Sequence, residues 1–307
     1  MAKKKIDFFI VPVLSLLFAL LTAITTGLRP DHIFLIVLVN VCYFATGFTR
    51  RLITGLAIII VYWVIYDSMK AWPNYLFHSV DIQPLYELEK KLFGISTAGI
   101  ILTPNEFLMQ HNSSVIDTLC GLFYLSWIPL PLFFAFYLFF RQKNLFLRFS
   151  MAFFIVNIIG FIIYYLHPAA PPWYFSEYGN DLLITTKSNA AGLLRVDQLF
   201  NIQLFEGIYS KGSNVFAAMP SLHASYPLIG LVYAMKQPAK WLRFVFATFM
   251  VGIWFSAVYL SHHYILDVLA GICCGLLGIF ILEKVLMKQP FFQNFLSNYE
   301  STITRKK

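Results

Sequence analysis

Two short segments of the sequence place histidines beside apolar stretches. Residues 220–223 read Pro-Ser-Leu-His and end in His223, and residues 261–267 read Ser-His-His-Tyr-Ile-Leu-Asp and include His263 and Asp267. The chain between His223 and His263 is mostly apolar, with one short basic turn. Two membrane-spanning helices joined by that turn would return both segments to the same membrane face. We therefore expect the two histidines to converge at one site.

The residue types in these segments suit phosphoryl transfer. His263 and Asp267 are four residues apart, so on a helix they would lie on one face, one turn apart. The carboxylate would then fix the imidazole tautomer and leave the other ring nitrogen as a nucleophile. His223, with an ordinary pKa of about 6.5, would act as general acid. The helix start at Ser221 offers backbone amides to an anion. This combination predicts a phosphohistidine mechanism.

Other interpretations of the same residues remain open. A single histidine near a membrane surface is more often an interfacial hydrogen-bonding group, and His263 with Asp267 is as well explained, taken alone, as a structural pair. A metal site is also conceivable from a set of four side chains: His223, His262, His263 and Asp267. The spacing typical of zinc hydrolases is missing, however. The coincidence of both histidine segments on one predicted face favours catalysis over these interpretations, and no cofactor is predicted.

Composition predicts a membrane protein. Hydrophobic residues make up 59% of the 307 residues and charged residues only 12%, against about 25% charged in soluble domains. Because lipid leaves backbone amides without partners, each span must be helical. The prediction is an all-α integral membrane protein of about eight transmembrane helices and two long extracytoplasmic loops. The predicted spans are 8–28, 33–48, 52–69, 115–140, 148–166, 221–236, 241–260 and 264–286. The second and sixth are short, so one of them is expected to be tilted, re-entrant or sheltered by its neighbours.

The charges predict the orientation. Placing the basic residues 3–5 in the cytoplasm also places most of the other lysines and arginines there, as the positive-inside rule expects. Both termini are then cytoplasmic, and both histidine segments lie on the extracytoplasmic face. The net charge of +8 follows from this distribution and does not indicate a nucleic-acid partner.

Other features of the sequence lead to structural expectations. Asp67 is expected to be solvated at a helix end, and the outer segment 70–114 to be structural filler. The four cysteines and the glycines of the last span are expected to serve packing. Pro129 and Pro131 are expected to kink the fourth span. The second outer loop, 167–220, is long enough to suggest a functional role.

The segments 216–224 and 259–267 resemble the second and third signature motifs of the type 2 phosphatidic acid phosphatase superfamily. With 169–174 and 192–197, they are similar to its inositol phosphorylceramide synthase branch. The resemblance covers about residues 165–275. It implies a helical core of that superfamily. With the predicted spans and charges, the predicted organisation is N-terminal transmembrane helices and an interfacial loop at 1–114, a catalytic phosphotransferase core at 115–288 and a cytoplasmic tail at 289–307.

The resemblance also implies roles and substrates. The second histidine, His263, would be the nucleophile, His223 the acid and base, and Asp267 the group that orients His263. The implied reaction transfers phosphoinositol from phosphatidylinositol to the primary hydroxyl of ceramide and releases diacylglycerol, without a metal. The alternatives are a lipid phosphate phosphatase and, outside enzymes, a lipid transporter or scaffold.

The sequence departs from the superfamily pattern where phosphate is usually bound. Thr22 stands where a lysine would precede Arg29 and Pro30, and Ala257 stands where an arginine would follow Ser256. The synthase branch shares these losses, which favours a transferase over a phosphatase. The residues predicted to contact substrate or phosphate instead are Lys211, Arg195 and His262, together with Ser221, Tyr264 and Trp173.

Overall fold

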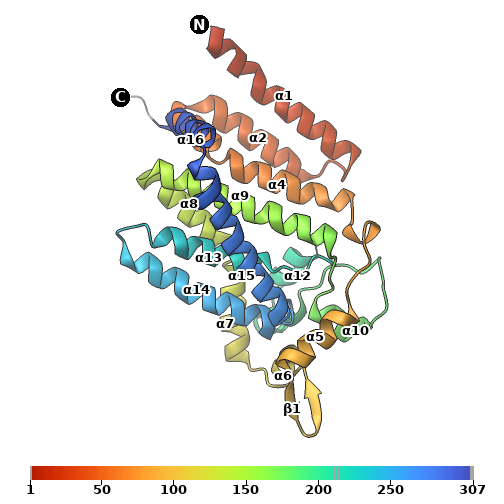
Figure 1. Cartoon of the computed structure of the whole chain (residues 1–307). Coiled ribbons are helices and arrows are strands. Elements are labelled where there is room, and N and C mark those ends of the chain that lie inside the picture. Colours follow the sequence, from red (N-terminus) through yellow and green to blue (C-terminus); the bar gives the residue numbers. More distant parts are fainter. Residues whose placement is uncertain (1, 211, 213, 305–307) are drawn as a thin grey trace.

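The computed structural model describes residues 2–210, 212 and 214–304. This part of the chain is almost entirely helical, with one two-stranded hairpin (Figure 1). The short segments between helices gather at one end of the bundle, and the last helix, α16, lies at the other end (Figure 1). The two histidine segments therefore share their end of the molecule with the long connections.

The N-terminal helices are apolar and pack in chain order. They are α1 (Ala2–Ile24), α2 (Pro30–Ala45), α3 (Gly47–Gly55) and α4 (Ala57–Ser68). Pro30 begins α2 because the first position of a helix needs no amide donor. The axes of α3 and α4 differ by 49°. Gly55, at the end of α3, allows close packing, since a β-carbon there would meet the Phe139 ring at 2.8 Å.

Short elements form the connections at the histidine end. Between α4 and α7 they are η1 (Met69–Ala71), η2 (Asn74–Leu76), α5 (Gln83–Phe93), β1 (Ile95–Thr97), β2 (Ile100–Leu102) and α6 (Pro104–Gln110). After α9 they are α10 (Pro172–Tyr178), η3 (Ala191–Leu193), α11 (Leu194–Phe200) and α12 (Leu204–Tyr209). The strands are antiparallel with Ser96 opposite Ile101, and both turn residues, Ala98 and Gly99, have positive φ. This is the backbone that a two-residue hairpin loop requires.

The remaining helices form the core around α13. They are α7 (Ser114–Leu125), α8 (Pro129–Arg141), α9 (Lys143–Leu166), α13 (Leu222–Ala234), α14 (Lys240–Tyr259), α15 (Ile265–Phe280) with its continuation η4 (Ile281–Val285) and η5 (Leu286–Lys288), and α16 (Pro290–Ile303). At about 1.5 Å per residue, α13 is shorter than a hydrocarbon core of about 30 Å. It packs against α8, α9, α14 and α15. Helix α13 is therefore sheltered by its neighbours, as predicted for one of the two short segments, and its crossing of the membrane stays a prediction.

The apolar helices support a membrane protein. Three described segments are long and apolar enough to span a membrane, namely α9, α14 and Ile265–Lys288, and counting each bent helix pair as one span gives up to five. The prediction of a helical membrane protein is confirmed at this level. All eight predicted spans fall on helices, but α2 and the apolar part of α1 are short. The count of eight stays a prediction.

Proline and glycine act in the core as expected. A bend of 42° separates α7 from α8, and α8 begins at Pro129, so the predicted kink of the fourth span is confirmed. Glycines of α15 allow neighbouring elements to approach closely. A β-carbon on Gly271 would lie 2.1 Å from the Ser221 carbonyl oxygen, and one on Gly278 would lie 2.4 Å from Val156. The predicted packing role of these glycines is confirmed.

The C-terminal segment is not a free tail in the described residues. Pro290–Ile303 forms α16, whose residues Phe292 and Leu296 are buried. The hydroxyl of Tyr299 donates to the carbonyl of Thr54 at 2.6 Å. The helix therefore packs on α3 and α9.

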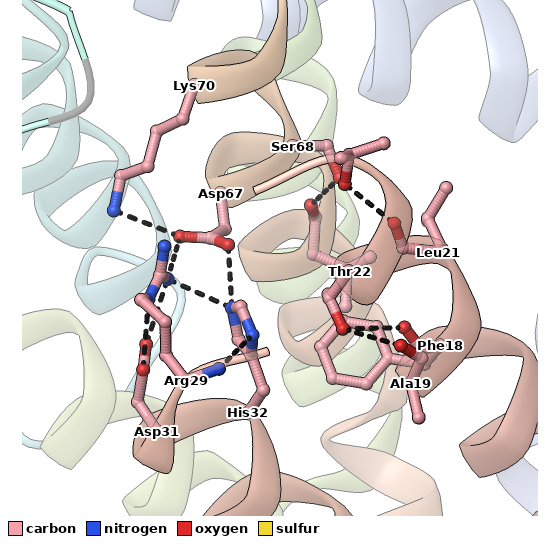
Figure 2. A network of polar contacts seen from close by, with 12 residues as sticks. Phe18, Ala19, Leu21, Thr22, Arg29, Asp31, His32, Asp67, Ser68 and Lys70 are labelled. Carbon is pink, nitrogen blue, oxygen red and sulfur yellow. Dashed lines mark hydrogen bonds and ion pairs between the residues drawn. The ribbon is translucent and has the colours of Figure 1, made fainter. Parts of the chain in front are cut away.

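Asp67 is buried, so the prediction that water solvates it is wrong. Figure 2 shows that the turn between α1 and α2 places Arg29 and His32 against the end of α4. Arg29 Nη2 lies 2.6 Å from Asp67 Oδ1, His32 Nε2 lies 2.9 Å from Asp67 Oδ2, and Lys70 Nζ lies 3.1 Å from Asp67 Oδ1. Asp31, His32 and Asp67 are also close enough to hold a metal ion, but the Arg29 guanidinium already contacts all three.

This network predicts unequal effects for two isosteric substitutions. Asp67→Asn should destabilise the protein by about 1.5–3 kcal/mol, because it removes the charge of the buried carboxylate that Arg29, His32 and Lys70 contact. Asp31→Asn is the matched control, since the Asp31 side chain is 51% exposed and such pairs contribute about 0–1 kcal/mol. Thermal unfolding in detergent measures both. Equal decreases in the unfolding temperature of the two variants would contradict the assignment of Asp67 as the centre of the network.

Candidate active site

The two histidines meet, as predicted. His223 lies in the first turn of α13, and His263 lies in the connection between α14 and α15. His223 Nδ1 is 3.2 Å from His263 Nε2, so the rings are in hydrogen-bonding contact. His223 Nδ1 also lies 3.0 Å from the hydroxyl of Tyr124, a residue of α7 that the sequence analysis did not single out.

His263 and Asp267 are close, but not as two positions on one helix. Helix α15 begins at Ile265, so His263 precedes it, and Asp267 lies in its first turn. Asp267 Oδ2 accepts the Tyr264 amide at 2.8 Å, which caps the helix. His263 Nδ1 lies 3.6 Å from Asp267 Oδ2, which is ion-pair distance rather than a hydrogen bond. The predicted stacking on one helical face is wrong, although Nδ1 still faces the carboxylate and Nε2 faces His223.

The backbone joins the two histidine segments directly. The Ser221 amide donates to the Asp267 carbonyl at 2.9 Å, and the Ser225 hydroxyl donates to the Gly271 carbonyl at 2.6 Å. The Ser221 amide already has a partner, so the prediction that it is free to bind an anion is wrong. The Ser221 side chain is fully buried.

A cavity of about 200 Å³ opens beside the histidine pair. Its described lining includes His223, His262 and His263, and a set of aromatic side chains: Tyr62, Tyr66, Tyr124, Trp127, Trp173 and Tyr209. Burial lowers the pKa of His263 to about 4, so its imidazole is neutral at physiological pH. A neutral imidazole with one nitrogen directed at a carboxylate is suited to nucleophilic attack on phosphorus.

Comparison with known proteins agrees with this geometry. The model of the PAP2 superfamily matches residues 83–281, which include both histidine segments. The chain belongs to this superfamily.

Two of the similar proteins are named as a phosphoinositol dihydroceramide synthase and an inositol phosphorylceramide synthase subunit. The chain is 44% identical to the phosphoinositol dihydroceramide synthase of Bacteroides thetaiotaomicron, over 94% of this chain and 95% of that protein. It is 24% identical to the catalytic subunit of inositol phosphorylceramide synthase from Schizosaccharomyces pombe, over 78% of this chain and 56% of that protein. No solved structure gives a significant match. The predicted resemblance and the predicted enzyme class, an inositol phosphorylceramide synthase-like transferase, are confirmed.

Of the residues predicted to replace the missing phosphate-binding arginines of the PAP2 superfamily, His262 lines the cavity and Arg195 does not. Arg195 binds Asp117 Oδ1 through Nε and Nη2, at 2.9 and 2.7 Å, and is not part of the described lining. Lys211 lies outside the described residues. Tyr264 caps α15 and is buried away from this cavity, whereas Trp173 and His262 line it. Among the described lining residues there is no lysine or arginine.

The outer segment 70–114 does more than fill space, so that prediction is wrong. Glu89 of α5 accepts the amides of Ile265 and Leu266, at 2.9 and 3.1 Å, through its two carboxylate oxygens. Asn105 of α6 donates from Nδ2 to the carbonyl of His263 at 2.9 Å. Both side chains are buried. They fix the backbone that carries His263.

One signal in the sequence pointed to Glu89. Leu85 and Tyr86 lie four and three residues before it, so a carboxylate shares the apolar face of an amphipathic helix. Burial raises the pKa of Glu89, and its bonds to the amides of Ile265 and Leu266 act against that rise. A buried carboxylate of this kind needs donors, and the start of α15 supplies them.

Removal of this cap should loosen the start of α15. In Glu89→Gln, one acceptor oxygen becomes a donor that faces an amide, so we expect the amides of Ile265 and Leu266 to exchange about 10–100-fold faster, as the loss of a charged hydrogen bond implies. Hydrogen–deuterium exchange with mass spectrometry measures the effect. Glu87→Gln, on the exposed face of the same helix, is the control. Unchanged protection of 264–267 in Glu89→Gln would contradict the capping role.

Proposed function

We propose that this chain is an integral membrane phosphotransferase that moves phosphoinositol from phosphatidylinositol onto ceramide or a related sphingoid lipid and releases diacylglycerol. The observation that carries the proposal is the contact of His223 with His263 beside the cavity, with the carboxylate of Asp267 behind the second ring. The relatives named phosphoinositol dihydroceramide synthase and inositol phosphorylceramide synthase support the substrates.

In the first step, His263 Nε2 attacks the phosphorus of the donor. The bond from phosphorus to the glycerol oxygen breaks, a nitrogen–phosphorus bond forms, and protonated His223 gives its proton to the leaving diacylglycerol. The present contact between Nε2 and His223 Nδ1 must open to admit the phosphate, so substrate binding separates the two rings. Asp267 stabilises the positive charge that develops on His263.

In the second step, the primary hydroxyl of the acceptor attacks the same phosphorus. The nitrogen–phosphorus bond breaks, an oxygen–phosphorus bond forms, and neutral His223 takes the hydroxyl proton. The Tyr124 hydroxyl, 3.0 Å from His223 Nδ1, holds that ring between the two steps. Each step exchanges one bond at phosphorus, and His223 returns to its starting protonation state.

The proposed arrangement in the membrane follows the charges of the loops. We place both termini in the cytoplasm and the histidine cavity on the extracytoplasmic face, with eight helices crossing or entering the membrane. Residues 115–288 form the catalytic core, and residues 1–114 position α15 through α5 and α6 and add α4 to the cavity wall.

Labelled phosphatidylinositol and ceramide, given to the purified protein, test the reaction. The expected product is an inositol-bearing sphingolipid, and His263→Ala and His223→Ala should each lower kcat at least 10³-fold, as expected for the nucleophile and the acid and base. His78→Ala is the control, because His78 is exposed and outside the described cavity lining. With the acceptor omitted, acid-labile label should remain on the wild type but not on His263→Ala. Release of water-soluble inositol phosphate alone would indicate a hydrolase instead.

Single cysteines test the orientation. Asp181→Cys, in the second outer connection, should react with an impermeant thiol reagent in intact cells because Asp181 is exposed at the histidine end. Ser297→Cys, on the exposed face of α16, should react only after permeabilisation. The reverse labelling pattern would show that the chain has the opposite orientation in the membrane, and it would not contradict the proposed reaction.

A further inference from the structure

His262 lies between two aromatic rings in the cavity wall, and the proposed reaction does not use it. Its ring stacks on Tyr124 at a centroid distance of 4.9 Å and an interplanar angle of 12°, and on Tyr209 at 4.7 Å and 28°. The side chain is only 6% exposed. A polar ring held this firmly next to the nucleophile is placed to contact a ligand rather than to fill space.

The hydrogen bonds of His262 determine what it can contact. Nε2 of His262 is buried without a partner among the described atoms, whereas the backbone of Ala190 lies close enough to the ring to act against the lowering of its pKa. The tautomer with its proton on Nδ1 accounts for both observations, and it leaves a lone pair on Nε2. Burial, with the neighbouring His263 and His223, lowers the pKa of His262 well below its ordinary value. The ring is neutral, so Nε2 accepts a hydrogen bond and cannot donate one to a phosphate oxygen.

Asn214 supplies the opposite polarity in the same cavity. Its Oδ1 accepts the Phe216 amide at 3.0 Å, which fixes the orientation of the side-chain amide. Its Nδ2 is buried and has no partner among the described atoms. Both His262 and Asn214 line the cavity. An acceptor and a donor without partners are therefore available. Each buried group destabilises the protein until a ligand supplies its missing hydrogen bond.

We propose that His262 and Asn214 form a hydroxyl-binding subsite for the polyol headgroup of the donor lipid. The proposal rests on the proposed function. The headgroup stays attached to the phosphorus that bonds to His263 through both steps, so its contacts must lie near His263, and His262 is the adjacent residue. Inositol hydroxyls both donate and accept, which satisfies Nε2 of His262 and Nδ2 of Asn214 together. This revises the predicted role of His262 from a phosphate ligand to a headgroup ligand.

Two donors that differ only in their ring hydroxyls test the subsite in the purified full-length protein. They are phosphatidylinositol and phosphatidylcyclohexanol, each with ceramide as acceptor. His262→Phe keeps a stacked ring but removes the acceptor, and Asn214→Asp keeps the acceptor for the Phe216 amide but removes the donor. Each should raise KM for phosphatidylinositol about 10–100-fold, with kcat and the KM for ceramide within about threefold. The kcat/KM for phosphatidylcyclohexanol should change less than threefold. His78→Phe is the matched control.

The possible failures are distinguishable. A wild type that forms no inositol-bearing sphingolipid overturns the proposed function. An active wild type whose preference for phosphatidylinositol survives in both variants overturns the subsite alone. The subsite is also overturned if both donors lose activity equally, which indicates a structural role, or if the KM for ceramide rises instead, which assigns the hydroxyl contact to the acceptor.

Discussion

The active-site geometry depends on a helix N-terminus that is buried. Helix α15 begins in the protein interior, where its first amides have no water to bind. Asp267 accepts one of these amides and Glu89 accepts two, so two carboxylates occupy the positive end of the helix dipole. These bonds fix the backbone that immediately follows His263. The same Asp267 side chain faces the His263 ring, so the cap of the helix is also the group that orients the nucleophile in the proposed reaction.

The partners of this helix start come from distant parts of the chain. Glu89 precedes Ile265 by 176 residues, and Asn105 precedes His263 by 158. The connection between α4 and α7 therefore has to fold into α5, the β1–β2 hairpin and α6 before the site is complete. This connection has to be ordered, because a flexible loop would not hold the buried side chains of Glu89 and Asn105 against the short backbone segment 263–266.

The sequence was sufficient for features that depend on local spacing and composition. The apolar runs predicted the helices, Pro129 predicted the bend, and the distance between His223 and His263 predicted their contact. The sequence was misleading where local spacing suggested one arrangement of side chains and the tertiary structure has another. The four-residue separation of His263 and Asp267 suggested that both residues lie on one helix, but α15 begins after His263. The pairing of Arg195 with Asp117, and that of Asp67 with Arg29, join residues far apart in the chain, and no local pattern indicates either partner.

Helix α4 belongs to the part of the chain that precedes the match to the PAP2 superfamily, yet Tyr62 and Tyr66 line the cavity. Tyr62 stacks on Phe161 of α9 at a centroid distance of 6.0 Å, which seals that side with packed aromatic rings. A phosphorylated histidine can pass its phosphoryl group to water or to an alcohol. A superfamily core without α4 would lack Tyr62 and Tyr66 on this side of the cavity. Under the proposed mechanism, the N-terminal helices would therefore cover the intermediate on this side and favour its transfer to a lipid alcohol over hydrolysis.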